Sequence, residues 1–511
     1  MARIISGERV LEAAALSRNV ECAARGFADL GVRAGDAVVL LLRNDFPFFE
    51  ASFAAQHLGA YATPVNWHGT PDEIAFIVGD CEAKVMVAHS DLLGPVQSAL
   101  PAGLKILVVE TPPEISSAYG VATEATRAEP DATIWNDWLA AHSEGPAPSA
   151  APPTAVMIYT SGTTGRPKGV RRAALSPEQR LGQIGMLGAA YGLAPGRPMT
   201  VLINGPMYHT APNAYATQAY AMGADLVLQA RFNPVETLEL IAAHGVTHVH
   251  VVPTMFVRLL KLPPEVRSGH DLSSLRFVAH GAAPCPVAVK QQMIAWWGPV
   301  IHEYYGSTET GIAACHDSAE ALRKPGTVGR ALPGSVIKVF DDEGREQPPG
   351  EVGDIYVRSG GMSDFTYHGR EEQRREVARG DLVTVGDMGW MDEEGYLFLC
   401  DRRRDMIISG GVNIYPAEIE AVLIGLPGVR DCAVFGIPDE EFGEAICAYV
   451  EPDASAPLTA ESLRTALASR LARFKVPKII EFSPALPRED SGKIFKRRLR
   501  EPYWAHLARS I

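Results

Sequence analysis

The apolar residues near the start of the chain recur at two spacings. Between Ser17 and Gly31 they follow helical spacing, which is typical of a helix with one buried face, and the positions are Val20, Ala23, Ala24, Phe27 and Leu30. Residues 37–42 are apolar without interruption, which favours a short buried strand. The chain is therefore predicted to open with a helix followed by a strand.

The same alternation continues further along the chain. Thr70-Pro71-Asp72-Glu73 supplies a helix cap, a first-turn proline and the acid of a capping box, directly before an apolar run at 74–78. Strands are predicted at 84–88 and 105–109. Alternating helices and strands of this kind predict a parallel sheet that is covered by helices on both faces.

A second alternating run begins at Asn233, which with Pro234 is expected to start a helix that continues to His244. The strands predicted after this helix lie at 247–252, 275–279 and 300–305. From about residue 326 the pattern changes to short strands and turns, and the predicted strands lie at 335–340 and 353–357. We expect this part, about 326–400, to be a smaller β-rich subdomain.

After Arg404 the pattern returns to mixed helix and strand. Pro416 is expected to open a helix, strands are predicted at 431–435 and 445–450, and residues 458–474 read as an amphipathic helix. This is enough chain for a compact domain. The predicted fold is α/β, with a large N-terminal domain at 1–401 built of stacked α/β subdomains plus the β-rich subdomain, and a small α+β C-terminal domain at 402–511.

Composition narrows the classes of function. The 511 residues carry 47 Lys and Arg against 60 Asp and Glu, and this formal charge of −13 argues against affinity for nucleic acid or an anionic membrane. No stretch reaches the roughly 18 apolar residues of a membrane-spanning helix. The N-terminus lacks the apolar core of a signal peptide, so we expect a cytoplasmic protein with no integral membrane segment. The seven cysteines include no C-x-x-C pair and indicate neither a zinc site nor a disulfide framework.

The most informative stretch is 159–169, which follows a Pro- and Ala-rich linker at 144–154 and an apolar run at 155–158 that predicts a strand. Its glycines let backbone N–H groups turn toward an anion, while its hydroxyls and a lysine add donors and charge. The expected phosphate-binding residues are Thr160, Ser161, Gly162, Thr163, Thr164 and Lys168. The stretch is not a Walker A loop, because no Gly-Lys-Ser/Thr closes it. A flexible surface turn is the alternative explanation.

The predicted strand at 300–305 ends in a turn with aromatic, hydroxyl and acidic residues. Glu309 can hold a metal ion that keeps most of its waters, Thr308 can donate to a phosphate oxygen, and Tyr305 offers a flat face to adenine. The preceding strand ends in small residues, including Ala282 and Ala283, which would let a purine lie against backbone. A glycine-containing turn that starts a helix is the alternative.

Three charged residues outside these strands also suit nucleotide binding. Asp387 and Arg402 are of the types that bind ribose hydroxyls, although such residues are usually solvated charges. Lys493 is presented from a predicted tight turn before the basic run 496–498, which could equally be a basic surface tail.

Together these segments resemble, in the same order and over essentially the whole chain, the motifs of the adenylate-forming superfamily. That superfamily includes acyl-CoA synthetases, nonribosomal peptide adenylation domains and firefly luciferase. The resemblance implies an ATP site in which 160–168 hold the pyrophosphate, Asp387 and Arg402 bind ribose, Lys493 is the catalytic lysine, Thr308 manages phosphate and Glu309 holds Mg²⁺. Ala282 and Ala283 would line adenine, Tyr305 would stack on it, and Gly306 and Ser307 would also belong to the ATP/AMP site.

The family reaction has two half-reactions in one site, with the small C-terminal domain rotating between them. The resemblance places the hinge at Arg404, where most relatives carry Asp or Lys. It implies that coenzyme A is bound by Gly410, Gly411, Phe474, Lys475 and Lys478. His209 matches an aromatic gate between the acyl pocket and the pantetheine tunnel.

These motifs lead to one main hypothesis, an ATP-dependent CoA ligase that acts on a hydrophobic fatty, alicyclic or aryl acid through an acyl-AMP. The expected partners are this small-molecule acid, ATP, Mg²⁺ and coenzyme A, without nucleic acid, and a homodimer is the assembly considered. Two alternatives stay open, namely a stand-alone adenylation enzyme that loads a carrier protein and a non-catalytic nucleotide-binding protein. The presence of Lys493 and Glu309 speaks against the second of these.

Overall fold

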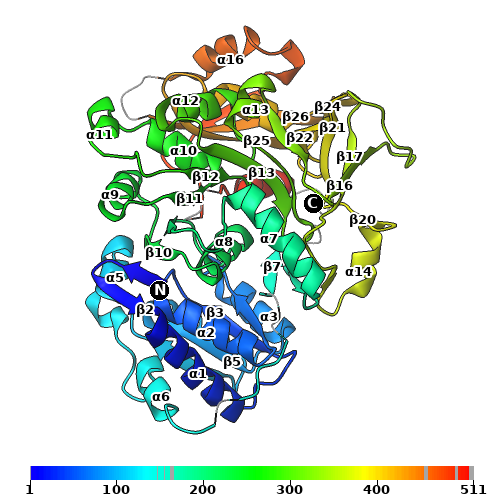
Figure 1. The fold of residues 1–511 in the computed structure, drawn as a ribbon. Helices are drawn as coiled ribbons and strands as arrows, with labels where there is room; N and C mark the ends of the chain where they lie inside the picture. Colours follow the sequence, from blue (N-terminus) through cyan, green and yellow to red (C-terminus); the bar gives the residue numbers. More distant parts are fainter. Residues whose placement is uncertain are drawn as a thin grey trace.

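The structure, a computed structural model, describes residues 2–146, 148–152, 154, 156–160, 166–453, 458–489 and 493–505. These residues form four β-sheets with helices packed on them (Figure 1). The N-terminal sheet and its helices, in blue and cyan, lie at one end of the molecule, and the C-terminal sheet, in yellow to orange, lies toward the other. The predicted α/β fold class is confirmed.

The N-terminal sheet has four parallel strands in the order β4 (Tyr61–Pro64), β3 (Ala37–Leu41), β5 (Val85–His89) and β6 (Lys105–Val109). All residues of β3 and β5 are buried, as their unbroken apolar runs predict. The surrounding helices are α1 (Ala13–Asp29), α2 (Phe46–His57), α3 (Pro71–Asp80), α4 (Ser90–Leu93), α5 (Pro113–Tyr119) and α6 (Trp135–Ala141). The capping box predicted at Thr70 and Glu73 is present at the start of α3.

A 15-stranded sheet forms the centre of the molecule. Its parallel half contains β1 (Arg3–Ser6), β10 (Asp225–Leu228), β9 (Thr200–Ile203), β11 (His248–Val251), β12 (Phe277–His280) and β13 (Ile301–Ser307), with β2 (Arg9–Glu12) at the edge. Its helices are α7 (Pro177–Tyr191), α8 (Thr210–Ala221), α9 (Pro234–His244), α10 (Pro253–Leu260), α11 (Pro264–Ser268) and α12 (Val287–Trp297). Asn233 caps α9 as predicted.

The β-rich part continues this same sheet instead of forming one of its own. The sheet turns antiparallel at the β13–β14 hairpin, where a Cβ on Gly306 would lie 2.2 Å from the carbonyl oxygen of Gly311, so only glycine permits this approach. Its further strands are β14 (Gly311–His316), β15 (Thr327–Ala331), β16 (Val336–Phe340), β17 (Gly353–Arg358), β19 (Ala378–Arg379), β20 (Leu382–Val383), β21 (Asp387–Met391) and β22 (Tyr396–Arg402); α13 (Ser318–Arg323) and α14 (Glu371–Glu376) lie between them in sequence. The domain boundary that is expected after residue 401 would lie at the end of β22. This boundary stays a prediction.

A small sheet of three strands carries the phosphate-loop candidate. Its order is β18 (Phe365–Tyr367), β8 (Lys168–Arg172) and β7 (Ile158–Thr160), all antiparallel. The strand predicted at 155–158 is thus misplaced, because Met157 donates its N–H to Ala62 of β4 and regular pairing with β8 begins only at Ile158. Residues 159–160 and 168–169 of this stretch thus belong to the paired strands β7 and β8.

The C-terminal sheet has five strands, β23 (Ile407–Ser409), β24 (Val412–Ile414), β25 (Val429–Asp439), β26 (Gly443–Pro452) and β27 (Ile479–Phe482). Its helices are α15 (Pro416–Ile424), α16 (Ala460–Ala468) and α17 (Lys496–Trp504). The helix predicted at 458–474 is too long, because α16 ends at Ala468 and a 3₁₀ turn at Arg473–Lys475 precedes Pro477. No helix in the described part of the chain is both long and apolar enough to cross a bilayer.

Candidate active site

The base of the β7–β8 hairpin places two predicted phosphate ligands side by side. Thr160 and Lys168 are directly opposed, and Lys168 is buried with its Nζ 5.2 Å from the ring centre of Tyr367. Burial lowers the pKa of Lys168, and Arg370 lowers it further, while Glu376 and Glu309 raise it. The other predicted loop residues, Ser161, Gly162, Thr163 and Thr164, lie outside the described residues.

The turn after β13 meets this hairpin. Thr160 Oγ1 donates to Glu309 Oε1 at 3.1 Å across 149 residues of sequence, and the hydroxyl of Tyr367 lies 3.4 Å from the same oxygen. Thr308 Oγ1 lies 2.6 Å from the hydroxyl of Thr210 at the start of α8. Residues from three distant segments therefore converge on Thr308 and Glu309.

Arg172 holds this turn in place, and sequence reasoning missed it. The Arg172 guanidinium, on β8, donates to the carbonyl oxygens of Thr308 at 2.9 Å and of Glu309 and Ser363 at 2.5 Å. Burial lowers the pKa of Arg172 to about 10. The sequence feature that could have indicated this role is a charged residue, Arg172, on a strand directly after the glycine-rich stretch.

Replacing Arg172 with methionine is expected to lower adenylate formation at least about 10-fold, because three carbonyls lose their donor and the Thr308–Glu309 turn shifts. The rate of ATP–pyrophosphate exchange measures this effect. Arg171→Met, on the same strand, is the matched control, since Arg171 contacts His368 and Tyr61 and not the turn. Equal loss in both variants would contradict the positioning role of Arg172.

Tyr305, Asp387 and Arg402 form a connected group on β13, β21 and β22. The Tyr305 hydroxyl donates to Asp387 Oδ2 at 2.8 Å, and Arg402 Nε donates to Asp387 Oδ1 at 3.2 Å. Burial and the Asp387 carboxylate both raise the pKa of Tyr305, so the phenol stays neutral. The structure thus brings together the residues predicted for adenine stacking and ribose binding.

The segment after β12 contains two exposed alanines and follows the strand that pairs with β13, which carries Tyr305. Ala282 has φ of 65°, a left-handed conformation that is uncommon for a residue with a side chain and that recurs at active sites. Ala282 and Ala283 are both exposed, whereas Gly281 is buried against Tyr304. This geometry leaves the backbone of 282–283 open to a flat ligand.

Lys493 reaches the same region from the far end of the chain. Residues 487–489 and 493–495 pair as a hairpin, here called the lysine hairpin, in which Glu489 N–H donates to the Lys493 carbonyl at 2.9 Å. Surrounding protein lowers the pKa of Lys493, and Arg402 and Arg404 lower it further, while Glu489 raises it; solvent still reaches the residue. Lys493, Arg402 and Arg404 thus lie close enough for their charges to interact, and Glu489 and Asp405 partly offset them.

Comparison with known proteins agrees with this geometry. A family model described as "AMP-binding enzyme" matches residues 3–364, and a second one described as "AMP-binding enzyme C-terminal domain" matches 418–493. The chain belongs to the adenylate-forming AMP-binding enzymes. Within them it falls in the acyl-CoA ligase branch, as the motifs predict, and ATP is the nucleotide of the family.

Three relatives illustrate the activities that are found among proteins similar to this chain. The fatty acid–[acyl-carrier-protein] ligase ScoC of Streptomyces coeruleorubidus is 33% identical over 98% of this chain and 93% of its own length. The long-chain-fatty-acid–CoA ligase FadD13 of Mycobacterium tuberculosis is 32% identical over 93% of this chain and 90% of its own. The crystal structure of the anthranilate CoA ligase AuaEII with anthranoyl-AMP has a TM-score of 0.83 and 25% identity, covering 98% of this chain and 94% of that one.

The residues predicted to bind coenzyme A lie on the C-terminal domain. They are not brought together with the group formed by Tyr305, Asp387 and Arg402. Gly410 and Gly411 are exposed, as is Phe474 with 54% of its surface accessible. Lys475 pairs with Glu418 and Lys478 with Asp439. Arg404, the predicted hinge residue, is exposed on the segment between β22 and β23.

The chemistry of Glu309 fits Mg²⁺. Mg²⁺ favours one or two carboxylates together with phosphate oxygens and retained waters. Glu309 lies beside the β7–β8 hairpin, where the hydroxyl oxygens of Thr160 and Tyr367 contact its carboxylate. Within the described residues there is no group of three or more His, Cys, Asp or Glu that could form an all-protein cage. Glu309 would therefore share the ion with ATP.

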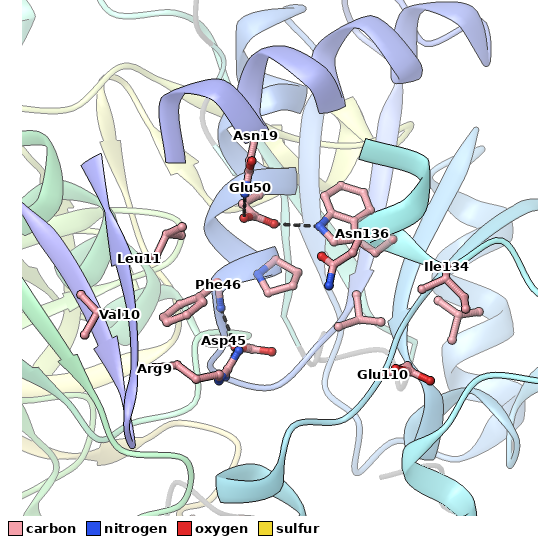
Figure 2. A pocket seen from close by; sticks show the side chains of 14 residues that line it. Arg9, Val10, Leu11, Asn19, Asp45, Phe46, Glu50, Glu110, Ile134 and Asn136 are labelled. Carbon is pink, nitrogen blue, oxygen red and sulfur yellow. Dashed lines mark hydrogen bonds and ion pairs between the residues drawn. The ribbon is translucent and has the colours of Figure 1, made fainter. Parts of the chain in front are cut away.

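A separate cavity of about 460 Å³ lies between β2, α2 and α6 (Figure 2). Glu50 at its wall accepts hydrogen bonds from Asn19 at 2.6 Å and Trp135 at 2.7 Å, and Arg9 pairs with Asp45, which caps α2. Burial raises the pKa of Glu50. None of the predicted site residues lines this cavity, and its carboxylates disfavour a polyphosphate. It is not the nucleotide site of this AMP-binding enzyme.

Proposed function

We propose that this protein is an ATP-dependent ligase that activates a hydrophobic carboxylic acid as its acyl-AMP and transfers the acyl group to coenzyme A. The observation that carries the proposal is the position of Lys493, which arrives from the C-terminal domain beside Arg402 and the Tyr305–Asp387 pair. Hydrophobic acids are favoured because the curated relatives are named as fatty-acid, feruloyl and indoleacetate ligases. A homodimer stays a prediction.

In the first half-reaction a carboxylate oxygen attacks the α-phosphorus of ATP, and pyrophosphate leaves. Two anions meet in this step, so positive charge placed where the new charge develops stabilises the transition state. Lys493 would bridge the carboxylate and the α-phosphate, and Lys168 would neutralise the departing phosphates. Thr308 would donate to a phosphate oxygen. Bound Mg²⁺, held by Glu309, would neutralise phosphate charge.

In the second half-reaction the thiolate of coenzyme A attacks the acyl carbonyl, and AMP leaves. A turn of the C-terminal domain would replace the lysine hairpin by the face around Gly410 and Gly411. Three large apolar side chains, Ile408, Val412 and Phe442, are exposed on this face, which supports its being covered in another orientation. His209 would then open the path for pantetheine.

A carrier protein is the second candidate for the acyl acceptor, because ScoC, which is named as a carrier-protein ligase, matches almost the whole chain. Its pantetheine arm carries the same thiol and would use the same face. The two acceptors therefore differ in what surrounds the thiol and not in the chemistry of the site.

A pyrophosphate-release screen tests the proposal. Fatty, aryl and amino acids are each offered with ATP and Mg²⁺, once with coenzyme A, once with a phosphopantetheinyl carrier protein and once without acceptor. We expect turnover with a fatty or aryl acid that depends on coenzyme A. Turnover only with the carrier protein would favour the second candidate, and preference for amino acids or turnover without acceptor would overturn the proposal.

A further inference from the structure

The lysine hairpin is held against the large domain by the side chain of Glu489, to which the sequence analysis assigned no role. Glu489 Oε2 lies 2.6 Å from His209 Nε2 across 280 residues of sequence, and only 6% of the Glu489 side chain is exposed. His209 directly precedes α8, and the next residue, Thr210, contacts Thr308. The contact therefore joins the lysine hairpin to the turn of Thr308 and Glu309, the residues predicted to bind phosphate and Mg²⁺.

Holding Glu489 also holds Lys493. The two residues are paired across the hairpin by the hydrogen bond from Glu489 N–H to the Lys493 carbonyl, and a second bond joins Phe495 N–H to the Pro487 carbonyl at 2.8 Å. Glu489 raises the pKa of Lys493, so the carboxylate also stabilises the ammonium form. A shift of Glu489 away from His209 would withdraw the lysine with it.

A second contact joins the two domains at another place. Lys261, which directly follows α10, donates from Nζ to the carbonyl oxygens of Val429 at 2.9 Å and Arg430 at 2.8 Å at the start of β25. Asp453 lies 3.9 Å from the same ammonium. Because this contact also crosses between the domains, it exists only while the C-terminal domain keeps this orientation.

We propose that Glu489 and Lys261 are positioning residues which set the balance between the two orientations of the C-terminal domain, and that Glu489 couples the lysine hairpin to the gate residue His209. The inference rests on the two-step reaction proposed above. Each contact stabilises only the orientation in which Lys493 faces the nucleotide, so its removal shifts the population toward the other orientation. When the hairpin leaves, His209 loses its carboxylate partner and is free to turn.

The test compares the two half-reactions in full-length variants. Glu489→Gln keeps the shape but loses the charge, and Lys261→Met keeps the stem but loses the ammonium. Loss of a hydrogen bond to a charged group predicts that acid-dependent ATP–pyrophosphate exchange falls about 10-fold in each variant. Transfer of the acyl group from supplied acyl-AMP to coenzyme A should be unchanged or faster, with the acid taken from the screen above.

Two matched controls separate this effect from general damage. Glu501→Gln makes the same chemical change in an exposed ion pair within α17, and Lys338→Met does so in an exposed pair on β16; neither should change either half-reaction. The thermal unfolding midpoints of all variants are measured alongside.

The outcomes are distinct. A changed ratio of the two half-reactions in both variants supports the inference. Equal loss of both half-reactions, or no change in either, in a protein whose wild type is active would overturn the inference alone. A wild type that shows no acid-dependent exchange with any acid would overturn the proposed function, and the inference with it.

Discussion

Lys493→Ala is expected to slow adenylate formation at least about 100-fold, the scale of losing one positioned donor to a developing charge. Transfer from supplied acyl-AMP to coenzyme A should stay largely intact, because the lysine has no part in the thiolate attack. Acid-dependent ATP–pyrophosphate exchange measures the first half-reaction, and thioester formation from acyl-AMP measures the second.

Arg497→Ala is the matched control for this variant. Arg497 lies four residues further along, is 71% exposed in its side chain and pairs with Glu501 within α17, so its loss removes a positive charge without touching the site. Both half-reactions should remain near wild type. Equal loss of the two half-reactions in Lys493→Ala would contradict the role assigned to the lysine.

Glu303→Ala is expected to destabilise the large domain by about 3–5 kcal/mol, because it leaves a buried ammonium without its partner. Glu303 pairs with Lys290 and lies 2.8 Å from His316 Nε2, and all three residues are buried between β13, β14 and α12. The thermal unfolding midpoint should fall by on the order of 10 °C. Glu303 directly precedes Tyr304 and Tyr305 on β13.

The pH dependence of this loss provides a second check. Burial alone would raise the pKa of Glu303, but Lys290 and the neighbouring histidines outweigh it and lower the pKa to about 2. The carboxylate therefore adds stability that is fully present above its ordinary pKa of 4.5 and is lost as pH falls toward 2. The difference in midpoint between wild type and Glu303→Ala should shrink on acidification below pH 4.5.

Two further variants make the result interpretable. Glu346→Ala breaks an exposed pair with Lys338, N to O 2.6 Å, and should cost no more than about 1 kcal/mol. Replacing both partners, Lys290→Met with Glu303→Leu, should recover much of the stability, because no charge is then left buried alone. A drop in Glu346→Ala as large as that in Glu303→Ala would contradict the account.

Local elements were predictable where the signal lies within a few neighbouring residues. The capping box of Thr70, the cap of Asn233 and the buried strands predicted at 37–42 and 84–88 each depend on short-range contacts, and all are present, the strands as β3 and β5. The helix that was predicted to reach Phe474, α16, ends earlier in the structure. The helical spacing of apolar residues continues through the 3₁₀ turn at Arg473–Lys475, which is closed by its own hydrogen bonds. The spacing of apolar residues does not distinguish a continuing helix from such a turn.

The sequence by itself determined the residue types of the candidate site and their order, because each motif is a continuous run of neighbours around residues 160, 282, 305, 387 and 493. Only the tertiary structure decided what holds them together. Arg172 on Thr308 and Glu309, and Glu489 on His209, join residues 136 to 280 positions apart. Such contacts depend on how sheets and domains pack, so no local pattern of apolar and polar positions encodes them.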